Sequence, residues 1–169
     1  MNQEDKQELL LIAREAIKKS DIKTDRFKEK RGCFVTLTKK GELRGCIGII
    51  EPIMSLGKAI VSAARSAAFS DPRFLPLQEQ ELKDIKIEIS ILSPVKEMKN
   101  KQDIDIGRDG LIIKAKGRSG LLLPQVAVEW KMDKKQFLEA VSEKAGLNKD
   151  SWKDKDARLF KFQVDAFSD

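Results

Sequence analysis

Hydrophobic and polar positions along the chain alternate with two different periods, and each change of period marks a predicted element. Between Gln3 and Lys19 the apolar residues recur at helical spacing among charges, which predicts an amphipathic helix that ends near Ser20. A second helical stretch follows Ser55 as a candidate N-cap and reaches Phe69. Its inner stripe is mostly alanine, so this helix is expected to lie close to a sheet.

The strongest strand pattern is DIKIEISIL, residues 84–92, in which isoleucines alternate with polar residues, so that one face belongs to the core. A hairpin is expected from CFVTLT and ELRGCIGII because Gly41 lies in the turn between them. Further short strands are expected at DIDI, LIIKAK and GLLL, separated by the turn sequences GRDG and GRSG, and one last strand at RLFKFQVDAF. Helices are predicted from Pro124 to Trp130 and from Lys134 to Lys144, with Gly146 ending the second.

This order of short strands and helices predicts an α+β fold with a mainly antiparallel sheet and packed helices. The chain of 169 residues is long enough to bury a hydrophobic core as a single domain over residues 1–169. No segment approaches the roughly 20 apolar residues of a membrane span, and the polar, acidic start does not resemble a secretory signal. A cytoplasmic location is therefore expected, with the two cysteines as free thiols.

The composition excludes several kinds of chemistry. The chain has no histidine and no tyrosine, which removes Ser/His/Asp and Cys/His arrangements, imidazole zinc sites and phenol chemistry. Cysteine is scarce and the carboxylates lack metal-binding spacing, so no metal is expected, and no nucleotide fingerprint predicts a cofactor. The net charge of +6 permits a nucleic-acid partner without requiring one.

The register of the hairpin decides where the hexapeptide LRGCIG, residues 43–48, points. A two-residue loop would need positive φ at Lys40, so we expect a loop of about three residues that ends at Gly41. The buried face would then contain three pairs: Leu37 with Leu43, Val35 with Gly45, and Cys33 with Ile47. The opposite face would hold Phe34, Thr36, Thr38, Arg44 and Cys46. The two thiols would consequently point to opposite sides of the sheet.

Arg44 and Cys46 are the main candidates for chemistry, because a guanidinium on the same strand face favours the thiolate form of a cysteine. Cys46 is the candidate catalytic residue and Arg44 a candidate substrate-binding residue. Gly45 and Gly48 leave room for a ligand and are further substrate-binding candidates. The alternative is that Cys46 is a small packing residue, that Arg44 is a surface ion-pair partner, and that the glycines make space for the alanine-lined helix.

The remaining candidates lie elsewhere in the chain. Glu88 is on the polar side of the core strand and is the candidate catalytic base or ligand, or else an exposed glutamate on a solvated face. Asp71 and Arg73 flank a proline and are candidate substrate-binding charges, although Asp-Pro is also an ordinary helix stop. Gln125 is a substrate-binding candidate or a cap of the short helix. Asp109 in GRDG is interpreted as turn chemistry.

The chain resembles the AMMECR1 domain family, whose hallmark is the LRGCIG hexapeptide. The resemblance extends in order through RGCFVTLTKKGELRGCIG, AAFSDPRFLPL, IEISILSP, DGLIIKAKGRSGLLLPQVAVEW and FLEAVSEKAGL, which cover most of residues 31–152. It implies an α+β domain of two closely joined subdomains with a cleft between them and LRGCIG near that cleft. It implies less about function, because the family's biochemical activity is not established.

Members of this family are similar to domains found beside or fused to Memo-like and radical-SAM proteins. This implies a role in modifying a small molecule, a protein or RNA with such partners. The chain has no CxxxCxxC cluster, so it is not expected to be the radical-SAM component. It also has Val141 where many relatives have a cysteine, so no second thiol is expected in that segment.

Three functional hypotheses remain open. The first is an enzyme or enzyme subunit that binds a small or extended anionic substrate in a cleft lined by Arg44, Cys46 and Glu88, with Cys46 as nucleophile or thiolate ligand. The second is a non-catalytic adaptor that docks a protein partner through the same cleft or the alanine-helix side. The third is an RNA-binding accessory domain, which would require strongly salt-dependent association.

Overall fold

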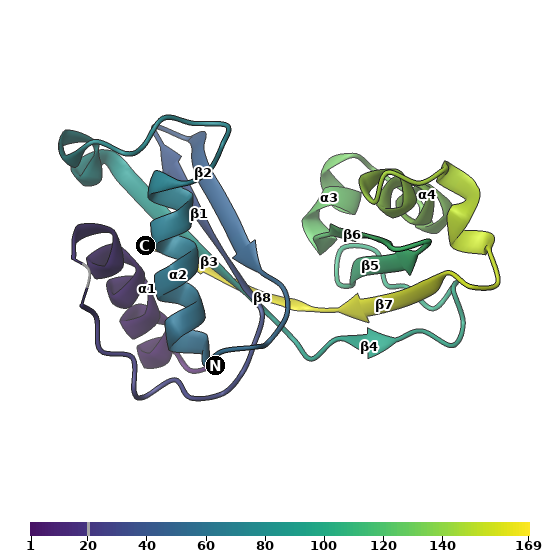
Figure 1. The fold of residues 1–169 in the computed structure, drawn as a ribbon, viewed down its shortest axis with the longest axis horizontal. Helices are drawn as coiled ribbons and strands as arrows, with labels where there is room; N and C mark the ends of the chain where they lie inside the picture. Colours follow the sequence, from purple (N-terminus) through teal and green to yellow (C-terminus); the bar gives the residue numbers. More distant parts are fainter. Residues whose placement is uncertain (20) are drawn as a thin grey trace. The chain divides into compact units, whose positions relative to one another are not determined.

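The chain folds into two compact units in a computed structural model that describes residues 1–19 and 21–169 (Figure 1). Unit 1 comprises Met1–Leu92 and Asp165–Asp169, and unit 2 comprises Ser93–Val164. Each unit has its own four-stranded sheet and its own hydrophobic core. The expected α+β class is confirmed, with two sheets of antiparallel strand pairs where the sequence suggested one.

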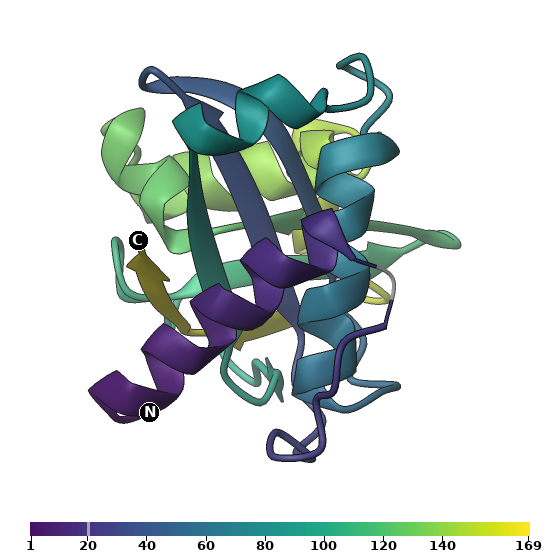
Figure 2. The ribbon, with the colours of Figure 1, turned by 90° about the vertical axis from the view of Figure 1, so that its left-hand side faces the viewer.

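Unit 1 is built on a sheet with the strand order β2-β1-β3-β8. Its elements are α1 (Gln3–Lys18), β1 (Cys33–Lys39), β2 (Glu42–Ile49), α2 (Leu56–Phe69), the 3₁₀ helix η1 (Glu79–Asp84), β3 (Ile85–Leu92) and β8 (Val164–Ser168). Figure 2 shows α1 and α2 lying across the same face of this sheet. The helix α1 ends at Lys18, while Ser20, near which we expected the end, lies outside the described residues.

The core of unit 1 follows the sequence pattern closely. The four alternating isoleucines of β3 are all buried, as is the alanine stripe of α2. Small alanines let α2 approach the sheet, and its contacts with β1 and β2 confirm the expected close packing. Ser55 occupies the N-cap position of α2, but its side chain makes no capping hydrogen bond.

The turn between β1 and β2 differs from the expected one. Lys40 and Gly41 both have positive φ, 52° and 84°, so the loop has two residues, as in the primed turns that match strand twist. A β-bulge follows, in which Arg44 has no partner on β1. The expected register was therefore wrong. The pairs on the face that packs against the core are Cys33 with Ile49, Val35 with Ile47, and Leu37 with Gly45, in which Ile47 and Ile49 are partly buried.

The two cysteines nevertheless lie on opposite faces, as expected. Cys33 has no exposed surface and packs in the core beneath the helices. Cys46 lies opposite Thr36, on the other face of the sheet, and is half-buried. Both thiols are free.

Unit 2 has the strand order β4-β7-β5-β6, with its helices packed on one face. Its elements are β4 (Lys96–Glu97), β5 (Gly110–Ala115), β6 (Arg118–Leu122), α3 (Pro124–Glu129), α4 (Lys134–Lys144), the 3₁₀ helix η2 (Lys149–Lys153) and β7 (Arg158–Phe162). The two predicted helices are confirmed, and Gly146 follows α4 with a positive φ of 69°.

One strand prediction and one turn prediction for unit 2 were wrong. DIDI forms no strand, because the carboxylate of Asp109 accepts the backbone N–H of Asp105 and closes a loop there. GRSG is not a turn over its whole length, since only Lys116 and Gly117 have positive φ and the following three residues belong to β6.

The expected last strand, RLFKFQVDAF, is divided at Gln163 into two strands of different sheets. Its first half is β7, which pairs with β4 and β5 of unit 2. Its second half is β8, in the sheet of unit 1. One alternating segment therefore serves both units.

The helices are short compared with a bilayer. The longest helix of the described residues, α1, has 16 residues and carries charges along its length. No helix within residues 1–19 and 21–169 has the length and apolar character needed to cross a membrane. The cytoplasmic location stays a prediction.

Candidate functional site

The backbone of Cys46 is held at the outer edge of β2 by two charged side chains. The N–H of Cys46 donates to Asp71 Oδ2 at 2.9 Å, and Arg73 Nη2 donates to the carbonyl of Cys46 at 3.3 Å. Arg73 also donates to Asp71 through Nε and Nη2, at 3.0 and 2.7 Å. This ion pair occupies the edge groups that a further strand would bind, so it protects the edge and fixes the position of Cys46.

The two residues of this ion pair differ in burial: the negative one is buried and the positive one is exposed. The Asp71 side chain is 1% exposed, whereas that of Arg73 is 54% exposed. The hydrogen bond from Arg73 holds the pKa of Asp71 well below its usual range, so Asp71 is ionised at neutral pH. Asp71 raises the pKa of Arg73, and the negative form of Cys46 adds a smaller effect in the same direction. The pair therefore presents its positive end to solvent next to Cys46.

The sulfur of Cys46 belongs to a row of polar side chains across three strands. Cys46 Sγ lies 3.2 Å from Thr36 Oγ1, its neighbour on β1. Glu88 of β3 lies opposite Thr36 from the other side. Directly opposed residues of antiparallel strands share a face, with Cβ atoms about 5 Å apart. A thiol, a hydroxyl and a carboxylate thus line up on the face opposite α1 and α2, a combination suited to nucleophilic and acid–base chemistry.

Arg44 is engaged with η1. Its Nε and Nη2 donate to the two carboxylate oxygens of Glu81 at 3.1 and 3.0 Å, and Lys39 Nζ donates to the same carboxylate at 2.9 Å. The hydrogen bonds from Arg44 are the main reason that the pKa of Glu81 falls to about 2. Within the described residues Arg44 Nη1 is buried without a partner. The guanidinium carbons of Arg44 and Arg73 lie 6.0 and 5.5 Å from the centre of the Phe74 ring. Arg44 thus forms an ion pair with Glu81, which is the role that the alternative interpretation of the hexapeptide gave it.

The spaces beside the two glycines are filled by the protein itself. A Cβ atom at Gly45 would lie 2.1 Å from the carbonyl oxygen of Ala67, in α2. A Cβ atom at Gly48 would lie 2.3 Å from the ring of Phe34, its partner on β1. Gly45 therefore makes room for the alanine-lined helix, and Gly48 for an aromatic ring.

Gln125 belongs to the other unit. It is half-buried in α3 directly after Pro124, and no side chain caps α3 in the described structure. Asp109 is more than a turn residue, because it is buried and pairs with Lys161 at 3.3 Å. No local pattern predicts this contact, since Lys161 lies more than fifty residues away along the chain.

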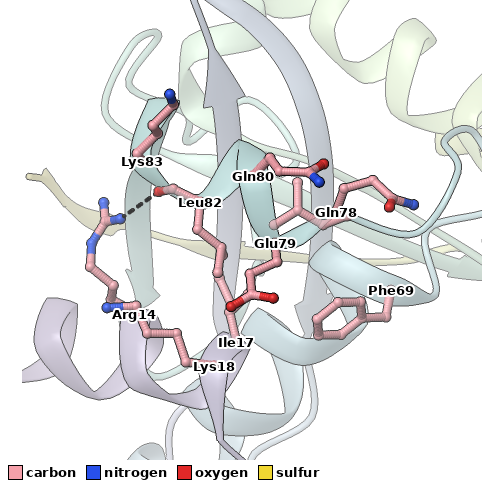
Figure 3. A pocket seen from close by; sticks show the side chains of 10 residues that line it. Arg14, Ile17, Lys18, Phe69, Gln78, Glu79, Gln80, Leu82 and Lys83 are labelled. Atoms are coloured by element: carbon pink, nitrogen blue, oxygen red, sulfur yellow. Dashed lines mark hydrogen bonds between the residues drawn. The ribbon is translucent and has the colours of Figure 1, made fainter.

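A pocket of about 910 Å³ lies in unit 1 between α1, the end of α2 and η1. Figure 3 shows Ile17, Phe69 and Leu82 around it, with Arg14 donating to the Leu82 carbonyl at 3.3 Å. None of the sequence-predicted site residues lines this pocket. The pocket is therefore separate from the row that contains Cys46.

The predicted site residues thus fall into three places, one of which is α3 of unit 2, where Gln125 lies. Arg44, Cys46, Asp71 and Arg73 gather at the edge of β2, and Glu88 lies across Thr36 from Cys46. Sequence reasoning missed the contacts of Thr36, Glu81 and Phe74, for which only their residue types were visible. Across residues 1–19 and 21–169 no group of three or more Cys, Asp or Glu is placed to hold a metal ion.

This fold, with LRGCIG on an edge strand, is that of an AMMECR1 domain. The family model described as AMMECR1 matches residues 9–167, and the chain belongs to this family. A protein of Methanopyrus kandleri, MK0488, is 46% identical, over 95% of this chain and 86% of its own length. A protein of Methanothermobacter thermautotrophicus is also 46% identical, over 85% and 78%. The crystal structure of the uncharacterized protein PH0010 from Pyrococcus horikoshii has a TM-score of 0.86 at 38% identity, covering 95% of this chain and 89% of that one.

Proposed function

We propose that the protein is an enzyme or enzyme subunit that binds a small or extended anionic substrate beside Cys46, whose thiol is the nucleophile. One observation carries the proposal: the Cys46 sulfur lies on the sheet face opposite the helices, 3.2 Å from Thr36 Oγ1, while its backbone is fixed by Asp71 and the exposed Arg73. A fixed thiol next to an exposed guanidinium is suited to an anionic reactant.

Each neighbour of Cys46 has a separate proposed role. Arg73 attracts and orients the anion, because its guanidinium is the exposed end of a pair whose carboxylate is buried. Asp71 is a positioning residue that holds both Arg73 and the Cys46 backbone. Glu88 is the base of the row, with Thr36 between it and the thiol. Arg44, bound to Glu81, stiffens the strand from which Cys46 projects.

A partner protein is part of the proposed function. The resemblance to domains found with Memo-like and radical-SAM proteins suggests that this chain acts in a modification pathway with such proteins. In that case the partner supplies or consumes the anionic substrate, and Cys46 is the point of contact on this chain.

Two alkylating agents of similar size test the proposal. Iodoacetate is an anion and iodoacetamide is neutral, so the ratio of their rates at Cys46 cancels the intrinsic reactivity of the thiol. We expect this ratio in the native protein to exceed the ratio for the same residue in urea by about threefold or more, because of Arg73. Mass spectrometry of the peptide that contains Cys46 measures both rates.

The matched control removes the charges and keeps their hydrogen-bonding groups. In the double variant Asp71→Asn, Arg73→Gln the rate ratio should fall to that of the unfolded chain. A native Cys46 that does not react, or that shows the unfolded ratio, would overturn the proposed role of the thiol. The adaptor hypothesis would then be the stronger one, and partner binding unaffected by Cys46→Ser would support it.

A further inference from the structure

The sheet of unit 2 carries two parallel rows of side chains on the face opposite α3 and α4. Strand register places Phe160, Ile112 and Leu121 side by side across β7, β5 and β6. The next register position holds Arg158 and Lys114 as directly opposed neighbours. These residues alternate with Leu111, Ile113 and Leu159, which face the helices in the core. An apolar row therefore runs beside a cationic row.

The aromatic ring of this face is closely associated with both cations. The Arg158 guanidinium carbon lies 5.2 Å from the centre of the Phe160 ring, and Lys114 Nζ lies 5.7 Å from it. Phe160 and Leu121 are half-buried, so each keeps some surface free for contact, whereas Ile112 between them is only 4% exposed. Lys114 is exposed. The Arg158 side chain is 61% exposed.

The excess positive charge of the protein also belongs to this unit. Unit 2 contains sixteen Lys and Arg against eleven Asp and Glu, whereas unit 1 contains seventeen against sixteen. Almost the whole net charge of +6 therefore lies in residues 93–164. Such a field attracts polyanions, and its effect weakens with salt.

We infer that this face of unit 2 binds single-stranded nucleic acid, with bases against the row of Phe160 and Leu121 and phosphates on Lys114 and Arg158. Single strands expose base faces that stack on aromatic side chains, while lysine and arginine beside the ring contact the backbone. A duplex would hide its base faces from this row. The inference concerns residues of unit 2 only, so it stands or falls independently of Cys46.

Replacing Glu97 provides a test in which nucleic-acid binding should become stronger rather than weaker. Its carboxylate binds Arg158 through two hydrogen bonds of 2.9 Å, at an exposed position where such a pair is weak. A phosphate on Arg158 has to compete with this carboxylate. Glu97→Gln should therefore tighten binding by about twofold to threefold, while the loss of a cation should weaken it.

The experiment uses the whole protein and fluorescein-labelled strands of about 20 nucleotides, oligo(U) RNA and oligo(dT) DNA, with fluorescence anisotropy between about 25 and 200 mM NaCl. Phe160→Leu keeps an apolar side chain but removes the stacking surface, and it should weaken binding about fivefold or more. Lys114→Gln should lower the slope of log Kd against log salt by about 0.7, the value for one lost phosphate contact.

Lys149→Gln is the matched control, because it removes one exposed lysine of unit 2 that lies on η2 and not on this face. It should change affinity less than Lys114→Gln does. Binding of both strands supports recognition through stacking, and binding of RNA alone supports an added contact to the 2′-hydroxyl. Absence of binding at low salt, preference for a duplex, full binding by a folded Phe160→Leu variant, or equal effects of the two lysine variants would overturn the inference.

Discussion

Replacing Glu81 with glutamine should destabilise the protein at neutral pH and have little effect near pH 2. In the folded protein Glu81 accepts hydrogen bonds from Arg44, from the backbone N–H of Gln78 and from Lys39, which lower its pKa from 4.5 to about 2. In the unfolded chain these donors are absent. The carboxylate form of Glu81 is therefore favoured by folding, and the neutral form is not.

The size of the effect follows from the two pKa values. The difference between 4.5 and about 2 corresponds to roughly 3 kcal/mol of stability at most. The Glu81 side chain is 16% exposed, so water and salt screen part of this interaction. We therefore expect Glu81→Gln to lower the free energy of unfolding by about 2 kcal/mol at pH 7.

The sign of the pH dependence is fixed by the direction of the shift. Because the pKa of Glu81 is lower in the folded state, its contribution is complete above 4.5 and is lost as the pH falls from 4.5 towards 2. Urea unfolding of both proteins, followed by circular dichroism across this range, measures the difference. The gap between wild type and Glu81→Gln should narrow steadily and nearly vanish at the acid end.

Two variants test whether Arg44 is the residue that stabilises the Glu81 carboxylate. Arg44→Gln, combined with Glu81→Gln in a double-mutant cycle, should give a coupling energy of about 1 kcal/mol or more at neutral pH. Glu79→Gln changes an exposed glutamate of the same 3₁₀ helix and should leave stability within about 0.5 kcal/mol of wild type. A stable Glu81→Gln variant, or a gap that does not change with pH, would refute the structural role of Arg44.

Two further predictions concern two glycines and the two cysteines of the hairpin. Gly45→Ala should destabilise the protein by about 3 kcal/mol or more, because its Cβ would lie 2.1 Å from the Ala67 carbonyl oxygen, whereas Gly41→Ala, in open space at a φ of 84°, should cost about 1 kcal/mol. Urea unfolding compares the two, and equal losses would contradict the packing argument. Iodoacetamide at about pH 8 should alkylate Cys46 at least a hundredfold faster than Cys33, whose pKa burial raises to about 12. Peptide mass spectrometry after timed quenching measures both rates, and similar rates in the native protein would show that Cys33 is accessible.

Local patterns correctly predicted the helices and strands in which buried and exposed positions recur at a regular spacing. The alternating isoleucines of DIKIEISIL were enough to place a core strand, because a sheet buries every second residue. The helices α2 and α4 were predicted nearly to the residue for the same reason, with Phe69 and Gly146 near their ends. In these segments the local sequence preference and the tertiary packing favour the same conformation.

Local patterns failed where pairing between residues that are far apart in the sequence determines the structure. The positive φ of Lys40 has a modest local cost, on the order of 1 kcal/mol, and the pairing of β1 with both neighbours outweighs it. The break at Gln163 leaves no trace in the alternation of RLFKFQVDAF, because both halves are strands and only their partners differ. The contacts of Cys46 with Asp71 and of Arg44 with Glu81 join residues 25 and 37 positions apart. Residue types alone do not specify such partners.

The hexapeptide contributes to the fold mainly through groups other than its sulfur. Gly45 accommodates α2, Arg44 binds η1, and the backbone of Cys46 is held by Asp71 and Arg73. These contacts would be the same for any small residue at position 46, since they use only its N–H and C=O groups. The fold therefore accounts for the glycine and the arginine but gives little reason for a thiol. This difference is the physical basis for placing the chemical hypothesis on Cys46 rather than on the whole motif.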